Sequence, residues 1–243
     1  MAVIGEDLDS SIIRQIKARQ KLHGSGVTKT RTSNQIKLLN STNAFLKVAS
    51  GVTLTSDKAK EISNYSGNKG TTIPKNYVLF NGTSNYKGKQ KEKFIDGSYE
   101  KSDFGLIPMA GVKKFNIKNL NRGSLKKATI NFIVHSKEQF DIVDTLYLRL
   151  GYTVFIEWGH SAYTTNGENY KVQNQSLIEN FFFKESIDYQ QLQEKIAQKR
   201  HDTFGNYDAL VGKISNFDWS FNADGSYDIK ITVISIGDVI ESL

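Results

Sequence analysis

The sequence predicts an α+β fold that is rich in β-structure. Three observations lead to this prediction. Several segments alternate apolar and polar residues, three others have the period of an amphipathic helix, and long stretches rich in Gly, Ser, Asn and Lys join them. The chain has 243 residues, which is enough for one large domain with a sizeable core.

The composition excludes several classes of protein. Hydrophobic residues make up only 38% of the chain, so much of it must be loop or solvated surface. Without cysteine there is no disulfide framework, no thiolate zinc site and no cysteine nucleophile. The four histidines are scattered, so we expect no metal and no cofactor. Neither a signal peptide nor a membrane span is expected, because no stretch approaches about 18 apolar residues.

Residues 1–24 are predicted to form an N-terminal helix or arm. Leu8, Ile12 and Ile16 recur at four-residue intervals among basic residues, which gives a narrow apolar stripe. Such a helix can lie on its own domain, which is the usual case, or on a neighbouring subunit.

The remaining residues, 25–243, are predicted to form a single β-rich domain. Near its start, three short strands are expected in the segments IKLLN, AFLKVASGVTL and YVLF. Two long polar insertions, at about 63–104 and 160–180, lack any period. Loops longer than about 15 residues in a compact domain are usually functional or disordered, so we expect the first insertion to order against a partner.

The regular core is predicted to begin at Gly105. The segments KKFNIKNL and ATINFIV alternate around the turn NRGS and form a hairpin with one buried face. Ser136 and Gln139 then form a capping box that opens a helix over 137–150, and Gly151 stops it. YTVFIEW follows as a strand.

A helix near 188–200 and a second hairpin complete the predicted fold. Two alternating runs flank Asp224 and Gly225, a dipeptide typical of type I′ turns, in which both central residues have positive φ.

The segment VFIEWGHSAY, residues 154–163, gathers reactive groups, among them Glu157, His160 and Ser161. A hydrolytic triad converges from distant parts of a chain, and no Gly-X-Ser-X-Gly motif is present. Glycosidase chemistry needs a second carboxylate facing the first, and nothing in the sequence brings Asp218 to Glu157. We therefore expect no catalytic residue here.

As a strand, the same segment directs Val154, Ile156 and Trp158 to one face and Glu157 to the other. We expect Trp158 in the core, Glu157 bound to a backbone or basic group, and Gly159 at the end of the strand.

The net charge of +7 suits an anionic partner without requiring nucleic acid. The densest basic run, KGKQKEK at 87–93, is typical of a solvated loop. Strands that contain aromatic residues lack Lys and Arg on the same face, and no phosphate-binding loop is present. A basic nucleic-acid-binding module therefore stays an alternative.

The segment from GLIPMAGV to FIEWGHS resembles the central part of the tail hub and baseplate structural proteins of large tailed bacteriophages. The matching residues are Gly105, Leu106, Pro108, Gly111, Gly123, Ser124, Leu125, Ala128, Gln139, Leu146, Tyr147, Gly151, Glu157, Trp158, Gly159 and Ser161. The final hairpin resembles the closing hairpin of this family through Gly212, Phe217, Trp219, Asp224, Gly225, Tyr227, Gly237 and Asp238. Leu150 departs from the pattern, since a proline is frequent there.

This resemblance implies a non-enzymatic virion structural protein with a tail-tube-like fold of antiparallel sheets or a β-barrel. We expect the strands 128–135, 152–158 and 227–236 in the barrel wall. The N-terminal helix and the insertions 63–104 and 160–180 are expected to make contacts between subunits.

The expected partners are copies of the chain in a trimeric or hexameric ring around the DNA channel, other tail or baseplate proteins, and passing DNA. The expected location is the virion tail, assembled in the bacterial host cytoplasm, with a role in tail assembly and genome delivery. The open alternatives are a cell-wall polysaccharide hydrolase that uses Glu157 as its acid, and the nucleic-acid-binding module.

The residues that we expect to be structural or to lie at interfaces are Gly105, Pro108, Gly111, Gly123, Ser124, Glu157, Trp158, Gly159, Phe217, Trp219, Asp224 and Gly225.

Overall fold

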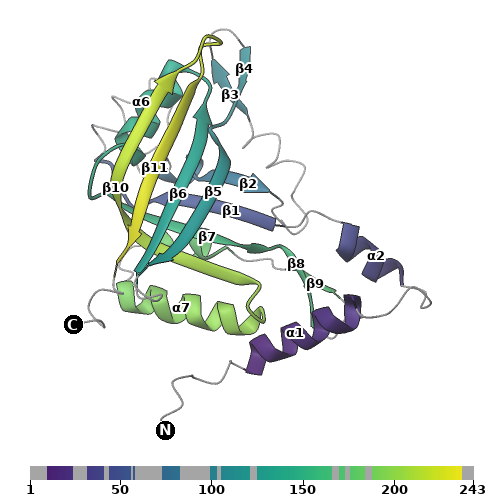
Figure 1. The fold of residues 1–243 in the computed structure, drawn as a ribbon. Helices are drawn as coiled ribbons and strands as arrows, with labels where there is room; N and C mark the ends of the chain where they lie inside the picture. Colours follow the sequence, from purple (N-terminus) through teal and green to yellow (C-terminus); the bar gives the residue numbers. More distant parts are fainter. Residues whose placement is uncertain are drawn as a thin grey trace.

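A closed seven-stranded β-barrel forms the centre of the computed structural model (Figure 1). The structure describes residues 10–23, 32–40, 44–55, 57, 73–82, 99–102, 105–120, 125–165, 170–172, 176–183 and 188–236. Around the barrel the strand order is β1-β2-β5-β6-β11-β10-β7. Neighbouring strands are antiparallel except β2 and β5, which meet in parallel where Phe80 pairs with Gly111. The prediction of a β-rich α+β fold with a barrel is confirmed.

The barrel strands are β1 (Ala44–Ser50), β2 (Leu79–Gly82), β5 (Gly111–Leu120), β6 (Leu125–Val134), β7 (Thr153–His160), β10 (Tyr207–Phe221) and β11 (Tyr227–Ser235). Two small sheets join β3 (Tyr99–Ser102) to β4 (Gly105–Pro108) and β8 (Ala162–Thr164) to β9 (Tyr170–Val172). The helices are α1 (Ser10–His23), α2 (Ser33–Asn40), α4 (Ile73–Asn76), α6 (Lys137–Tyr147), α7 (Tyr189–Asp202) and the π-helical segment η2 (Ile178–Phe182). The three expected wall strands lie in β6, β7 and β11, and the three expected helices correspond to α1, α6 and α7.

Helix α6 packs against the inner face of the barrel. Ile142, Val143 and Leu146 belong to the same apolar core as the inward side chains of the strands. The hydroxyl of Tyr147 lies 2.7 Å from the backbone oxygen of Tyr77 and 3.1 Å from that of Val48. Burial of this phenol raises the pKa of Tyr147 well above its ordinary value, so the hydroxyl stays a donor.

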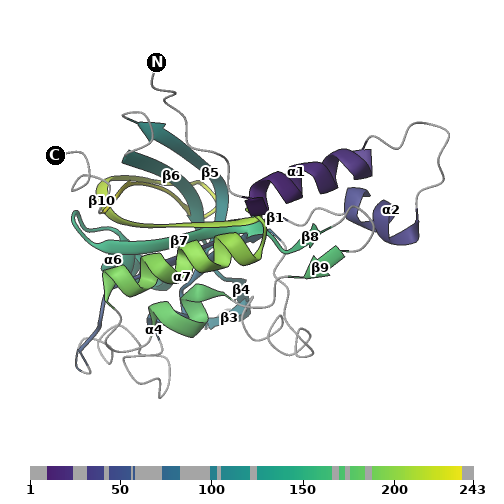
Figure 2. The ribbon, with the colours of Figure 1, turned by 90° about the horizontal axis from the view of Figure 1, so that it is seen from below.

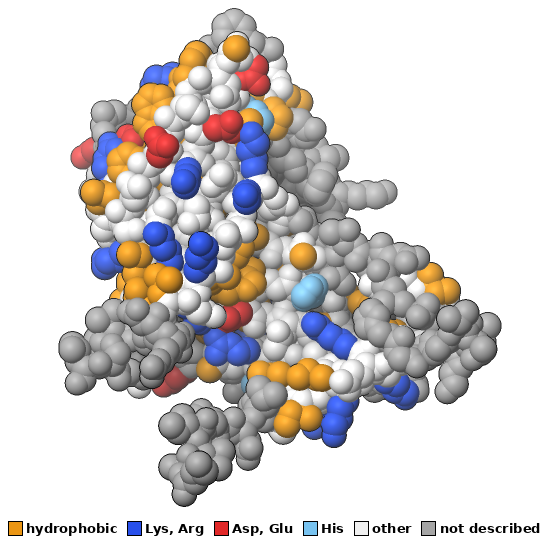
Figure 3. Space-filling model, in the orientation of Figure 1, with side chains coloured by type: hydrophobic (Ala, Val, Ile, Leu, Met, Phe, Trp, Pro, Cys, Tyr) orange, Lys and Arg blue, Asp and Glu red, His pale blue; other side chains and the backbone are white. Residues whose placement is uncertain are grey.

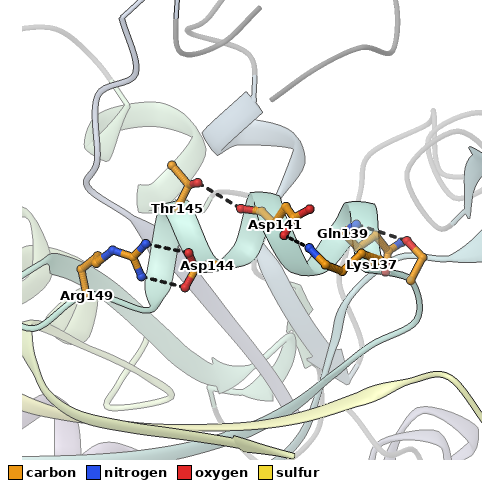
Figure 4. A network of polar contacts seen from close by, with 7 residues as sticks. Lys137, Gln139, Asp141, Asp144, Thr145 and Arg149 are labelled. Atoms are coloured by element: carbon orange, nitrogen blue, oxygen red, sulfur yellow. Dashed lines mark hydrogen bonds and ion pairs between the residues drawn. The ribbon is translucent and has the colours of Figure 1, made fainter. Parts of the chain in front are cut away.

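Local polar contacts set the ends of α6 (Figure 4). The Ser136 hydroxyl accepts the backbone N–H of Gln139 at 3.1 Å, and the Gln139 side chain accepts the N–H of His135 at 3.0 Å. Arg149 binds both carboxylate oxygens of Asp144 at 2.7 Å just beyond the end of the helix. The helix ends at Tyr147, three residues before the expected end.

A second apolar core lies outside the barrel. The outer faces of β1, β7 and β10 are covered by η2 and α7 (Figure 2). Its buried members are Ala49, Phe155, Leu177, Ile178, Leu192, Ile196, Tyr207, Ala209 and Val211. In contrast, no described helix covers the outer face of β5, β6 and β11.

The prediction of a strand over IKLLN is wrong, because this segment belongs to helix α2. Thr32 and Gln35 form a capping box just before this segment: the Thr32 N–H donates to Gln35 Oε1 at 2.9 Å, and Gln35 N–H donates to Thr32 Oγ1 at 3.3 Å. Such a reciprocal pair starts a helix, and it outweighs the short apolar run that suggested a strand.

The expected type I′ turn is also wrong, although the hairpin itself is confirmed. Gly225 has φ +84°, but Asp224 is not among the described residues with positive φ. Backbone bonds from Gly225 to Asn222 at 3.0 Å and from Asn222 to Ser226 at 2.8 Å close a longer loop. This longer loop needs positive φ at one residue only, and Gly225 provides it. Asp224 therefore does not adopt positive φ.

Gly159 does not end β7, contrary to expectation. The strand continues to His160, whose N–H donates to Asn206 O at 2.9 Å, and β8 begins two residues later. A Cβ atom on Gly159 would lie 2.3 Å from Asn206 O. Glycine is therefore required by the close approach of two backbones and not by a strand end.

The described parts of the two polar insertions contain regular elements. The stretch 63–104 includes α4, β3 and the barrel strand β2, and the stretch 160–180 includes β8, β9 and the start of η2. Gly123 and Ser124 lie outside the described residues, as do Gly237, Asp238 and the basic run 87–93.

Replacement of Gly159 by alanine should lower the free energy of unfolding by about 2–3 kcal/mol, because the new methyl group meets backbone that cannot move away cheaply. Gly111→Ala is the matched control, since its Cβ would have no neighbour closer than 3.8 Å. Urea unfolding followed by circular dichroism measures both. Equal losses in the two variants would contradict the close approach at Gly159.

Candidate functional site

The carboxylate of Glu157 lies on the outer face of β7 and is fully buried. The Ser176 hydroxyl donates to its Oε1 atom, the Leu177 N–H donates to Oε2 at 3.0 Å, and the Tyr207 hydroxyl donates to Oε2 at 2.9 Å. Both oxygens of the carboxylate are thus occupied by donors from the start of η2 and from β10. Hydrogen bonds to a charged acceptor are among the stronger ones in proteins.

The surroundings of this carboxylate provide positive charge at the barrel wall. Strand pairing places Lys47 of β1 directly opposite Glu157. Lys199 of α7 lies 4.2 Å from the ring centroid of Tyr207. Burial, together with the charge of Glu157 and its hydrogen bond, raises the pKa of Tyr207 well above its ordinary value. The tyrosine therefore stays protonated and holds the carboxylate in place.

This geometry does not support acid–base catalysis by Glu157. Alternation along β7 directs His160 to the opposite face of the strand, so the two side chains do not form a pair. Asp218 lies nine residues further along β10 than Ala209, the partner of Glu157, which corresponds to about 30 Å of strand. Glycosidase carboxylates stand about 5–9.5 Å apart.

The neighbours of Glu157 have separate structural contacts. Trp158 is half-buried on the inner face, and its ring centroid lies 5.5 Å from that of Phe115. Phe217 is half-buried against the same inner core. Ser161 is buried just beyond β7.

The residues expected between 105 and 111 connect the small β3–β4 sheet to the barrel. Gly105 has φ +122°, a conformation that favours glycine. Pro108 O accepts a hydrogen bond from Gln139 Nε2 at 2.8 Å, which ties β4 to α6. Gly111 lies where β2 and β5 pair.

Four aromatic side chains cluster where α6 begins and the β10–β11 hairpin turns. We call this cluster, formed by Phe140, Trp219, Phe221 and Tyr227, the aromatic tip. Phe140 stacks on Tyr227 with ring centroids 4.4 Å apart and meets Trp219 edge-on at 5.0 Å. Trp219 is 48% exposed and Phe221 is 63% exposed. Large aromatic side chains so exposed are typical of interaction sites.

Charged side chains lie on the same elements as the aromatic tip, and Lys137 Nζ lies 5.9 Å from the Phe140 ring centroid. Glu138 and Asp141 belong to the first turns of α6, and Asp224 belongs to the hairpin turn; all three are exposed. Hydrogen bonds from the Ser226 hydroxyl and N–H lower the pKa of Asp224 and keep it charged. Lys137 forms an ion pair with Asp141.

The uncovered outer face of β5, β6 and β11 is basic (Figure 3). We call its exposed lysines Lys114, Lys118, Lys127 and Lys230 the lysine face. Strand register places Lys118 directly opposite Lys127. A hollow of about 260 Å³ opens beside Lys114 and Lys230, and it is also lined by Asp218 and Asp228.

Comparison of the chain with protein-family models, curated proteins and solved structures gives no match. Its site must therefore be judged from its own residues. In the part of the chain that the structure describes, no three His, Asp or Glu side chains come together as metal ligands. Among the helices described, none has the length and apolar character needed to cross a membrane.

Sequence reasoning missed the partners of Glu157. Ser176 is 19 positions away and lies in a polar stretch, and Tyr207 is 50 positions away at the start of a strand. Neither carries a local pattern that marks it. Only the pairing of β7 with β10 and the path of the chain into η2 bring them together.

The pKa shift of Tyr207 predicts a loss of stability in alkali. A tyrosine whose pKa is higher in the folded state stabilises the fold fully below its unfolded pKa of about 10, and this contribution is lost as the pH rises further. Tyr207→Phe should reduce the alkaline slope of the unfolding free energy by up to about 1.4 kcal/mol per pH unit.

Ser176→Ala is the control for this experiment. It also removes a donor to Glu157, so it should lower stability, but it removes no titrating group and should keep the wild-type slope. Urea unfolding at a series of alkaline pH values measures both variants. A Tyr207→Phe slope equal to that of the wild type would contradict the buried, protonated tyrosine.

Proposed function

We propose that the protein is a non-enzymatic virion structural protein, a subunit of a tail hub or baseplate ring around the DNA channel of a tailed bacteriophage. The observation that carries this proposal is the use of Glu157. The carboxylate of Glu157, in the segment with the most reactive groups, is buried and links η2 to the barrel strands β7 and β10. Because donors of its own chain occupy both oxygens, this carboxylate stabilises the fold, which supports a role through contact.

The surface of the molecule also supports a role in assembly. One half of the barrel is wrapped by α7 and η2, whereas the other half exposes a bare sheet (Figures 1 and 2). The aromatic tip exposes Trp219 and Phe221 at the end of the hairpin. The residues of the family resemblance support the architecture too, since Gly159 and Gly212 both lie where a Cβ would collide with a neighbouring strand.

The proposal predicts that the protein is a stoichiometric part of a phage tail. In particles purified from cells that express the chain with its neighbouring genes, quantitative mass spectrometry should find it at a copy number that is a multiple of three. An epitope tag on the chain should place it by electron microscopy at the tail end. Intact tails that lack the protein would contradict the proposal.

A nucleic-acid-binding module is the second candidate function, and the lysine face favours it. Like charges placed directly opposite each other on a sheet are unfavourable, as for Lys118 and Lys127, and a bound polyanion relieves that repulsion. The face lies on strands rather than in a loop, so its charges are held at fixed spacing.

This candidate predicts sequence-independent DNA binding that weakens steeply with salt, because bound phosphates release their counterions. Fluorescence anisotropy with duplex DNA should show at least about tenfold weaker binding for the variant Lys118→Glu/Lys127→Glu. The control Lys195→Glu/Glu194→Lys rearranges charge on α7 and should bind like the wild type. Binding that ignores both salt and the sheet lysines would exclude this function.

A further inference from the structure

One face of helix α1 packs against its own chain, and the opposite face points outward. Ser11, Gln15, Ala18 and Leu22 are buried where α1 meets α7 and β8. Arg19 donates to Asn206 Oδ1 at 2.6 Å, and Arg14 lies 5.4 Å from the Phe204 ring centroid. These contacts fix how the helix is turned about its axis.

Two isoleucines lie on the outward face of α1. Ile13 is 38% exposed and Ile16 is 42% exposed, and both lie on the side away from the buried stripe. Exposed Lys17 lies beside them. The helix contains four basic residues and no acidic residue. The outward face is therefore apolar at its centre and positively charged.

The aromatic tip has the complementary character. Its centre is apolar, with Trp219 and Phe221 exposed, and its rim carries the carboxylates of Glu138, Asp141 and Asp224 beside the ammonium group of Lys137. An apolar centre inside a charged rim is the usual anatomy of a protein interface. Opposite charges on the two rims would steer the surfaces together and fix their register.

The two surfaces lie at opposite ends of the molecule. In Figure 1 the β10–β11 turn and the start of α6 lie at the top, whereas α1 lies at the bottom, and Figure 2 shows α1 from the lower side. One copy cannot join them to each other. A contact between them must therefore be made by two copies, arranged head to tail.

We propose that the aromatic tip of one copy docks on the outward face of α1 of a second copy. This inference rests on the proposed function, since it names the contact that would build the ring. Because the two halves of the contact differ, each copy keeps one free half after docking. Such a heterologous contact closes into a ring when the rotation between copies permits, and otherwise it grows into a filament.

The test uses one variant in each half of the contact. Ile16→Glu places a carboxylate at the centre of the α1 face, and Phe221→Glu does the same at the aromatic tip. Both positions are exposed, so the monomer should stay folded, and circular dichroism checks this. We expect each variant alone to lose concentration-dependent association in sedimentation velocity, with a dissociation constant at least about tenfold higher.

Mixing the two variants gives the decisive measurement. The Ile16→Glu copy retains its tip, and the Phe221→Glu copy retains its α1 face, so one intact contact remains per pair. The mixture should form a one-to-one dimer and nothing larger. Leu150→Glu, at a residue 64% exposed outside both surfaces, is the control and should associate like the wild type.

Charge reversal provides a second measurement. Lys17→Glu should weaken association at low salt, and adding Glu138→Lys to the same chain should restore it in part. Association of either single variant like the wild type, a mixture that stays monomeric, or a wild-type chain that never associates would overturn the inference. If the protein is found in tails and the variants Ile16→Glu and Phe221→Glu enter tails like the wild type, this contact is overturned and the proposed function stands.

Discussion

Strand β7 holds the fold together, because its two faces belong to two different cores. Val154 and Ile156 point into the barrel, where they meet α6, while Phe155 and Glu157 point outward to η2 and β10. On each edge it also pairs with a barrel strand, β1 on one side and β10 on the other. Since side chains alternate strictly along a strand, a shift of one residue would place Glu157 in the apolar interior.

Burial of a carboxylate is costly unless its oxygens are satisfied, and this cost makes the Glu157 site specific. The three donors come from two separate parts of the chain, so the site forms only when both are in place. The carboxylate thus selects one arrangement of η2 against the barrel. Glu157, which we considered as a catalytic acid from the sequence, is better explained as the residue that binds η2 to the outer face of the barrel.

The basic helix α1 lies far from the acidic side chains at the rim of the aromatic tip. Helix α1 and the tip lie at opposite ends of the barrel (Figure 1), whereas the lysine face shares β11 with the tip and borders a hollow that is also lined by Asp218 and Asp228. A modest net charge of +7 therefore hides strong local differences. Such a separation of opposite charges suits the head-to-tail contact that we propose.

The sequence alone determined the strands of the central module and the start of its helix, because alternation and a capping box are local signals; the helix ends at Tyr147, before the Gly151 that was expected to stop it. It also assigned the side chains of Glu157 and Trp158 to opposite faces of a strand, because side chains alternate along a strand. It missed α2, whose capping box lies just outside the apolar run, and it gave Gly159 the wrong role. Only the tertiary structure decided the closure of the barrel, the donors to Glu157 and the gathering of the aromatic tip, because these join residues that are distant in the chain and carry no local mark.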